Sequence, residues 1–250
     1  MFFRKNRAAR REAEPKLTHS VRDYRALVQH HLRENPEDAT FALAKSIGAP
    51  DMTTFHRQGD GHVAVLKHHG LADRMTVYDL GAGCGRTAQA LQRSGWKGEY
   101  TGADVVTELL EELERQCPTY ETIIELDQAI AAASGVTDMI CAWSVFTHLY
   151  PPEIYLFIRD AHRALKPGSK LLFSFLEMEE PAHDRVWRAV QEHVQAAIPA
   201  EQLDTFLHRD WIRRYARDAG FEEPQFTDGM DNTHHPELWQ ALAVLRKPLS

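Results

Sequence analysis

The chain has 250 residues, of which 43% are hydrophobic and 26% charged, a composition typical of one globular domain with additions. A formal net charge of −7 makes nucleic acid an unlikely partner, and three scattered cysteines exclude a disulfide framework and favour a reducing, cytoplasmic compartment. No apolar run approaches the roughly 20 residues of a membrane span, and the start lacks a signal-peptide core, so we expect no membrane insertion.

The N-terminal part is expected to be a basic tail followed by helices. Residues 1–18 are rich in Lys and Arg, and we expect them to be disordered. Residues 19–48 show apolar side chains at helical spacing, and a further helix is expected from about 60 to 69. We therefore expect residues 19–70 to form an N-terminal helical cap, which would serve as a lid or as a dimer surface.

Strands and helices alternate in the middle of the chain. The expected strands lie near 76–80, 99–104, 120–126, 137–143 and 169–176. The expected helices lie near 86–94, 107–116, 128–133 and 152–165. Short apolar strands separated by helix-length segments indicate a doubly wound α/β fold, with a mostly parallel sheet and helices on both faces.

The pattern changes after the fifth expected strand. Residues 178–219 look mostly helical, and about 178–210 read as a helical insertion. The insertion carries an apolar stripe that consists of Trp187, Val190, Val194 and Ile198. Residues 221–227 and 238–246 predict two further strands joined by a polar loop. These two strands indicate a terminal antiparallel hairpin at the edge of the parallel sheet.

A glycine-rich turn follows the first expected strand, and it is the most specific signal in the chain. Asp79 ends the strand, and Gly81, Gly83 and Gly85 follow at alternate positions before a helix begins. Glycine lets the backbone approach a ligand closely, and the free N–H groups at a helix start face that ligand. A carboxylate at this place would repel a pyrophosphate but tolerates a cationic ligand.

Two more carboxylates are expected at the ends of neighbouring strands. Asp104 ends the strand after the turn, where an acidic residue of a doubly wound fold accepts hydrogen bonds from ribose hydroxyls. Asp127 follows the third strand and could accept a hydrogen bond from an adenine amino group. The main alternative interpretation of this pattern is a nicotinamide-dependent enzyme. Arg86 disfavours it, because Arg86 stands where the dinucleotide fingerprint has its third glycine.

Four motifs in order make the chain resemble the class I S-adenosylmethionine-dependent methyltransferases. They are Asp79-Leu80-Gly81-Ala82-Gly83-Cys84-Gly85, the acidic Asp104, the segment from Ser144 to Leu149, and the turn from Leu165 to Phe173. The matching motifs lie within residues 56–176. The expected order of strands and helices resembles that of the family up to the end of the chain. The resemblance implies a seven-stranded sheet with an antiparallel last strand, a methyltransferase domain over residues 71–250, and S-adenosylmethionine as cofactor.

The resemblance also implies roles for individual residues. The backbone from Gly81 through Ala82 and Gly83 to Gly85 would approach the methionine part of the cofactor, with Asp79 acting through water or on the ammonium group. Asp104 would bind the ribose hydroxyls. The other residues that it implies for cofactor binding are Val105 and Asp127 beside the adenine and Trp143, Ser144 and Phe146 near the methyl group.

Histidine is the simplest base for a hydroxyl acceptor, because it titrates nearest neutral pH. His148 follows the fourth strand directly, and His183 and His235 lie where this family builds acceptor pockets. A structural role for His148 remains an alternative. The adjacent histidine pairs lack the spacing that places two ligands on one helix face, so we predict no metal site, with a dispersed site of oxygen ligands as the remaining alternative.

The expected function is methylation of a small molecule, most simply O-methylation of a sugar, glycan-linked or phenolic hydroxyl. A non-catalytic cofactor-binding accessory subunit, or methylation of a protein or RNA acceptor, remains an alternative. We expect a monomer or a homodimer. The acceptor pocket is expected in the loops after strands four and five and in the terminal hairpin, with the candidates Tyr150, Glu177, Met178, His183, Trp187, Met230, His234 and His235.

Overall fold

The computed structural model describes residues 19–196, 203–231 and 238–249. Three helices precede the sheet: α1 (His19–Glu34), α2 (Ala39–Ser46) and α3 (Met52–His68). The Asp38 and Asp51 side chains accept hydrogen bonds from the first turns of α2 and α3, and such caps define where helices begin. The predicted basic tail lies outside the described residues.

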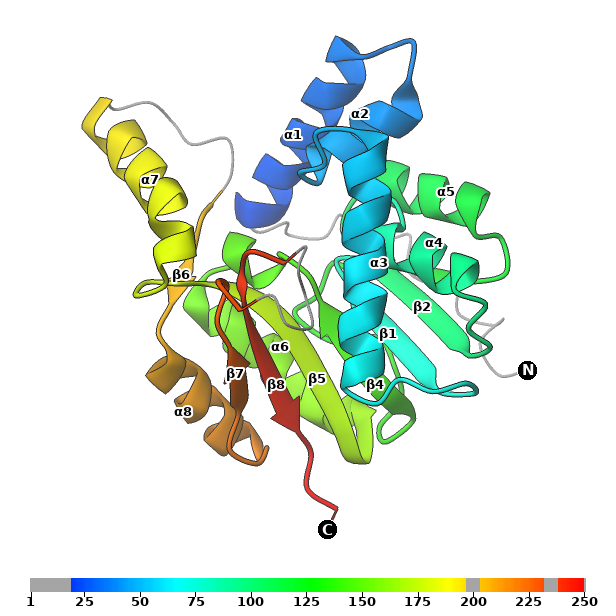
Figure 1. The fold of residues 1–250 in the computed structure, drawn as a ribbon, viewed down its shortest axis with the longest axis vertical. Helices are drawn as coiled ribbons and strands as arrows, with labels where there is room; N and C mark the ends of the chain where they lie inside the picture. The colour runs from blue at the N-terminus through cyan, green and yellow to red at the C-terminus, as the bar shows by residue number, and fades with distance from the viewer. Residues whose placement is uncertain (1–18, 197–202, 232–237, 250) are drawn as a thin grey trace.

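The sheet follows the predicted alternation of strands and helices (Figure 1). Its first half consists of β1 (Thr76–Leu80), α4 (Arg86–Arg93), β2 (Glu99–Asp104), α5 (Thr107–Gln116), β3 (Glu121–Ile124) and β4 (Thr137–Ala142). Its second half consists of η1 (Phe146–His148), α6 (Pro151–Ala164), β5 (Leu165–Glu177), η2 (Pro181–His183), α7 (Asp184–Ala196), β6 (Phe206–Leu207), α8 (Arg209–Ala219), β7 (Gln225–Thr227) and β8 (Ala241–Arg246).

The strand order is β3-β2-β1-β4-β5-β8-β7, with β6 paired to β5. The five strands β1 to β5 are parallel, and β8 runs antiparallel to β5. The predicted fold class is therefore confirmed, including the antiparallel last strand. The two-residue strand β6 is an addition that the sequence pattern did not indicate.

Both faces of the sheet are covered by helices. Successive strand residues point to opposite faces, so Val77 enters one core and Tyr78 the other. Helices α3, α4 and α5 cover the Val77 face, and α6 and α8 cover the Tyr78 face. The short apolar strands are thus buried on both sides, as parallel strands usually are.

The helix expected at 128–133 does not form, and the segment between β3 and β4 is irregular. Its backbone groups bond to α6 instead of to one another. Arg163 donates to the carbonyls of Ile130 and Ala132 at 2.8 Å, and Asp160 accepts from the Ile130 N–H at 2.6 Å. Side chains from a distant helix satisfy these groups, and that contact cannot be read from local periodicity. In the described part of the chain, no helix is long and apolar enough to cross a membrane.

Candidate cofactor and acceptor site

A cavity of about 920 Å³ lies at the carboxyl ends of β1, β2 and β4 and brings together most of the predicted site residues. Parallel strands end at the same edge of a sheet, so residues far apart in sequence meet there. The predicted residues that line the cavity are Asp79, Gly81, Ala82, Gly83, Asp104, Val105, Asp127, Trp143, Ser144 and His148.

The turn after β1 depends on glycine at three positions. Gly81, Gly83 and Gly85 have φ angles of 70°, 56° and 89°, in the left-handed region that L side chains rarely adopt. A Cβ on Gly81 would lie 2.3 Å from Cγ2 of Val145. The N–H groups of Gly81 and Ala82 both donate to the Ala103 carbonyl, at 2.7 and 2.9 Å. The turn is therefore fixed against β2, with its backbone against the cavity.

Asp79 is 1% exposed and lies beneath this turn. The Tyr100 hydroxyl donates to Oδ2 at 2.7 Å, and the Cys141 thiol lies 3.4 Å from Oδ1. Burial raises the pKa of Asp79 to about 6, although these hydrogen bonds act in the opposite direction. A carboxylate in this state would bind a cationic group strongly, because it is poorly solvated.

Asp104 is 5% exposed and is held by backbone N–H groups. Gly83 N–H donates to Oδ2 at 2.9 Å, and Val106 N–H donates to Oδ1 at 3.0 Å. Burial raises the pKa of Asp104, and the N–H groups partly offset that rise. Each oxygen retains a lone pair for a further donor, so the carboxylate can accept hydrogen bonds from a ligand hydroxyl.

Two polar side chains on the wall between α3 and α4 have buried atoms without a hydrogen-bond partner. They are Oε1 of Gln58 and Nε of Arg86. The Arg86 Nη2 donates to the Ile47 carbonyl at 2.8 Å, and burial lowers the pKa of the guanidinium. No ion pair joins Arg86 to a carboxylate in the described part of the chain. An unpartnered acceptor and an unpartnered cationic donor in the lining of one cavity match the ammonium and the carboxylate of an α-amino acid.

The sequence interpretation missed this pair, since it treated Arg86 only as a departure from the dinucleotide fingerprint. The two residues meet because α3 approaches the start of α4 very closely: a Cβ on Gly59 would lie 2.5 Å from the Arg86 carbonyl oxygen. A glycine inside the α3 pattern, next to Gln58, was the only local sign of such an approach.

His62 from α3 forms the neighbouring wall. Its ring stacks on Trp143 at a centroid distance of 4.4 Å and an angle of 17°, and Nδ1 lies 3.0 Å from the Thr87 hydroxyl. Burial, together with the nearby Arg86, holds the pKa of His62 well below its usual value. His62 is therefore a neutral ring at neutral pH, and it fixes the orientation of Trp143.

Ser144 follows β4 in a strained conformation, with a φ of 57°. Its N–H donates to Oγ of Ser174 at 2.8 Å, and both serine hydroxyls donate to Oε1 of Gln240, at 3.1 and 2.7 Å. Left-handed non-glycine residues concentrate at functional sites, where surrounding bonds maintain the strain. Here the bonds come from β5 and from the residue that precedes β8.

His148 stands on the cavity wall one turn further along the chain. Nδ1 lies 2.8 Å from the Leu203 carbonyl, so Nδ1 carries the proton and Nε2 is the ring's proton acceptor. Burial lowers the pKa of His148, and the Leu203 bond and the charge of Asp204 partly offset this. The imidazole is neutral at pH 7, and its Nε2 can accept a proton.

Helix α1 covers the cavity from above. Arg25 donates through Nε and Nη2 to the Val105 carbonyl, at 3.0 and 2.7 Å, which ties α1 to the loop after β2. The Tyr24 ring stacks on His148 at 6.0 Å and 24°. Burial, followed by the charge of Asp104, raises the pKa of Tyr24, so its phenol stays protonated.

Three of the predicted site residues that the structure describes do not line the cavity. Gly85 caps α4, and Phe146 packs in the core against Phe157 and Phe173. His183 is 1% exposed; its Nδ1 accepts from the Glu177 N–H at 2.7 Å and its Nε2 lies 3.2 Å from the Trp239 carbonyl. His235 lies outside the described residues.

The described acceptor-pocket candidates in the loops after β4 and β5 and in the terminal hairpin also lie outside the cavity lining. The cavity extends instead between α1 and α7, so the described members Tyr150, Glu177, Met178, His183, Trp187 and Met230 are absent from its lining. His234 and His235 lie outside the described residues. The loop pattern indicated the correct edge of the sheet, but the two helices that wall this part of the cavity carry no motif.

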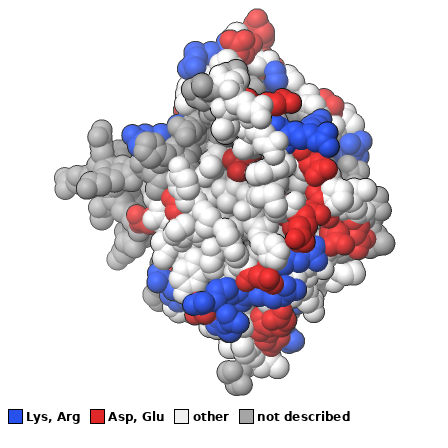
Figure 2. Space-filling view, turned by 90° about the vertical axis from the view of Figure 1, so that its left-hand side faces the viewer, with Lys and Arg blue, Asp and Glu red and all other residues white. Residues whose placement is uncertain are grey.

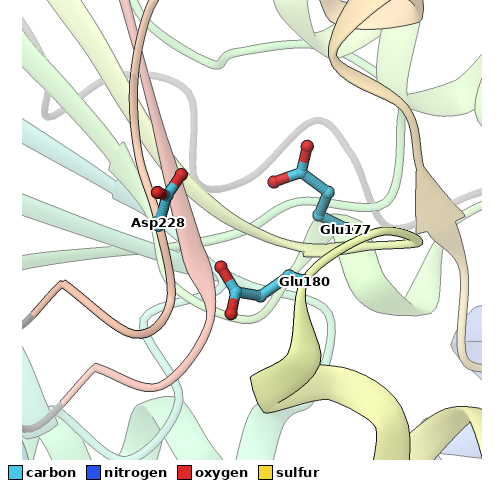
Figure 3. Close-up of side chains that lie close together, drawn as sticks. All are labelled: Glu177, Glu180 and Asp228. Atoms are coloured by element: carbon cyan, nitrogen blue, oxygen red, sulfur yellow. The ribbon is translucent and has the colours of Figure 1, made fainter.

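Three carboxylates approach one another at the end of β5, with oxygen atoms within 4.8 Å: Glu177, Glu180 and Asp228 (Figure 3). The Arg209 guanidinium donates to both oxygens of Glu177 at 2.7 Å and also to Asp228. Glu180 accepts from the Gly229 N–H at 2.9 Å. The cluster is a partnered ion-pair network that joins α8 to β5, and it gives no reason to propose a metal site.

Comparison with known proteins places this geometry in a family. Residues 54–223 match the family model of the methyltransferase domain. The sarcosine/dimethylglycine N-methyltransferase of Halorhodospira halochloris is 27% identical over 159 residues, which cover 61% of this chain. The match spans only 53% of that relative, about half of its length.

Two solved structures share the fold at low sequence identity. The first is magnesium protoporphyrin IX methyltransferase from Synechocystis PCC 6803 with bound S-adenosylhomocysteine. It has a TM-score of 0.62 and 16% identity, and the match covers 91% of this chain and 97% of that one. The second is phosphoethanolamine N-methyltransferase 2 from Haemonchus contortus, in complex with phosphomonomethylethanolamine and S-adenosylhomocysteine. It has a TM-score of 0.58 and 13% identity, and the match covers 90% of this chain and 60% of that one.

The residues of the cavity fit the cofactor of this family. Gln58 and Arg86 match an amino-acid head, Asp104 matches ribose hydroxyls, and the glycine turn leaves room for close approach of the ligand. Sequence motifs, strand order and family match agree: the chain belongs to the class I S-adenosylmethionine-dependent methyltransferases, and S-adenosylmethionine is its cofactor.

Proposed function

We propose that this protein methylates a small molecule at a hydroxyl group, with His148 as the general base. The observation that carries this proposal is the neutral His148 on the wall of a cavity of about 920 Å³. That volume is near the upper end for ligand sites and holds a cofactor and an acceptor together. A metabolite with a sugar or phenolic hydroxyl meets these requirements.

The cofactor half of the cavity is assigned to residues at the strand ends and on the adjoining helices α3 and α4. Gln58 accepts from the cofactor ammonium, and Arg86 donates to its carboxylate. Asp104 accepts from the ribose hydroxyls, Val105 and Asp127 border the adenine, and the glycine turn lies along the methionine chain. Trp143 and Ser144 flank the methyl group. The orphaned atoms of Gln58 and Arg86 support this orientation, because a bound amino-acid head gives each of them a partner.

When bound, S-adenosylmethionine supplies an electrophilic methyl group on a sulfonium. The protein has to align the acceptor oxygen, exclude water and remove the hydroxyl proton. His148 suits the last task, since Leu203 fixes Nδ1 as the protonated nitrogen and leaves Nε2 to take the proton. The low pKa of His148 keeps Nε2 unprotonated over the neutral range.

An amine is the second candidate acceptor. The curated relative is a sarcosine/dimethylglycine N-methyltransferase, and Asp204 lines the same cavity as His148. Burial raises the pKa of Asp204, and no donor within the described residues hydrogen-bonds to it. A substrate ammonium would supply that donor. Asp204→Asn should then weaken binding of amines at least tenfold and leave phenols and sugars unaffected.

A metabolite screen with mass spectrometry tests the proposed activity: one compound should gain a methylene group only when S-adenosylmethionine is added. His148→Asn keeps a donor for the Leu203 carbonyl but removes the base. We expect it to lower kcat by about 100-fold or more, with unchanged affinity for S-adenosylhomocysteine. Binding of S-adenosylhomocysteine without turnover of any compound would favour the accessory-subunit alternative, and unchanged kcat in His148→Asn would remove His148 as base.

A further inference from the structure

Helix α7 carries three valines that the described part of the chain does not fully bury. None of the residues of α7 is buried. Val186, Val190 and Val194 line the cavity together with Ala189, Arg185 and His193 of the same helix, and Val194 is 75% exposed. The three valines, which we call the valine column, recur every four positions and therefore lie on one side of the helix. A surface helix normally buries such a column against a core.

The valine column is an inner wall of the cavity. The same cavity is lined by Tyr24 and Leu27 of α1 and by Leu149 beside His148. Helices α1 and α7 both stand above the carboxyl edge of the sheet (Figure 1). Figure 2, seen from the side of α7 and α8, shows few charged residues across the middle of this face, with Lys and Arg near its lower edge and residues of both charges at the top and along the right-hand side.

The wall formed by α1 is fixed, whereas α7 makes few contacts with the other described elements apart from the preceding η2. Arg25 ties α1 to the Val105 carbonyl. For α7, the contact with β6 is an edge-on approach of Trp187 to Phe206 at 5.3 Å. Trp187 does not line the cavity, so this contact leaves the valine column uncovered. A ligand between α1 and α7 would complete the packing of both helices.

Resting on the proposed function, we infer that the acceptor is amphipathic: a hydroxyl or amine reaches His148, and an apolar body lies along the valine column. The rise from Val186 to Val194 is eight helical steps, or about 12 Å at 1.5 Å per residue. An apolar chain or ring system of about that length covers it. A second copy of the chain is a poorer occupant, because the column lies inside a concave site that continues into the cofactor half.

Binding of para-alkylphenols tests this inference. Calorimetric titration first establishes that S-adenosylhomocysteine binds the full chain. Phenols with para-alkyl chains from methyl to octyl, below their solubility limits, are then titrated into the saturated protein. Affinity should rise by about fourfold per added methylene, the factor that burial of one CH₂ gives, until the chain exceeds about 12 Å.

Val190→Asp should lower affinity for para-octylphenol at least tenfold and change affinity for para-cresol less than twofold, because only the long chain reaches the column. Gln191→Asp is the matched control: it adds the same charge to α7 at a position outside the cavity lining and should leave both affinities unchanged. Neither residue is buried, so both variants should fold; circular dichroism checks this.

The outcomes separate the two proposals. Absence of S-adenosylhomocysteine binding would refute the proposed function and with it this inference. Binding of S-adenosylhomocysteine with no chain-length dependence, or equal losses in Val190→Asp and Gln191→Asp, would refute the inference alone. Sedimentation that shows a dimer lost in Val190→Asp would also refute it, since a second copy would then cover the column.

Discussion

The buried Asp79 should make the stability of this protein depend on pH in a direction opposite to that of most carboxylates. Burial raises its pKa from 3.8 to about 6. The folded state therefore binds more protons than the unfolded state between these two values, and stability falls as pH rises through that window. The difference of about two pH units corresponds to about 3 kcal/mol of unfolding free energy. This contribution is fully present below pH 3.8 and absent above about pH 7.

Asp79→Asn isolates this effect, since asparagine has nearly the same shape and remains neutral. Urea unfolding of both proteins at a series of pH values gives the two free energies, and their difference cancels the titration of all other groups. The unfolding free energy of the wild type, relative to that of Asp79→Asn, should fall by about 3 kcal/mol between about pH 4 and pH 7. Above pH 7 the difference between the two proteins should stay constant. Parallel pH profiles for the two proteins would refute the assignment of a raised pKa to Asp79.

The same titration should control cofactor affinity. The cofactor carries an ammonium group, which favours the ionised form of Asp79, so binding should release the proton from this carboxyl group. Affinity for S-adenosylhomocysteine should therefore increase by up to tenfold per pH unit below about 6 and level off above it. Titration calorimetry at several pH values measures the slope. A slope that persists in Asp79→Asn would show that another group is responsible.

Three further substitutions test particular contacts. Arg86→Met should weaken S-adenosylhomocysteine about tenfold or more but leave 5′-methylthioadenosine, which lacks the amino-acid head, unchanged by calorimetry. Equal losses for both ligands would contradict the assignment. Gly81→Ala should destabilise more than Gly95→Ala in urea: both residues have positive φ, but only Gly81 leaves no room for a Cβ. Equal losses would argue against the clash. Arg209→Met should cost about 3 kcal/mol in unfolding free energy by leaving Glu177 unpaired, with S-adenosylhomocysteine affinity retained; loss of that affinity would mean that the ion pair also shapes the site.

The strand ends of the candidate site could be predicted because their determinants are local. A β-prone run that ends in Asp79, followed by three glycines, has few structural solutions, and the parallel order of β1 and β2 then brings Asp104 to the same edge. The positive φ angles of the three glycines agree with this expectation. His148 lines the same cavity, since η1 follows β4 after three residues.

Other parts of the site could not be predicted, because they depend on contacts between distant segments. The orphaned Gln58 and Arg86 share a wall only because α3 packs tightly on the start of α4. His183 looked available from its place after β5, but two backbone groups hold its ring in the interior. The segment 128–133 has an alanine-rich sequence that favours a helix, yet Asp160 and Arg163 of α6 bind its backbone.

The two halves of the cavity are built from different parts of the chain, and this has a consequence for specificity. The cofactor half consists of strand ends and turns, whose geometry is set by the sheet, and of the tightly packed helices α3 and α4, so a change there should affect both the fold and the cofactor. Much of the acceptor half consists of α1 and α7, of which α7 has no residue in the core. Under the proposed arrangement, we expect substitutions on the valine column to alter the acceptor and to leave the cofactor site and the stability unchanged. A shared fold with relatives that act on very different molecules is compatible with this separation. The acceptor of this protein should be sought through the chemistry of α7 and α1 rather than through the names of its relatives.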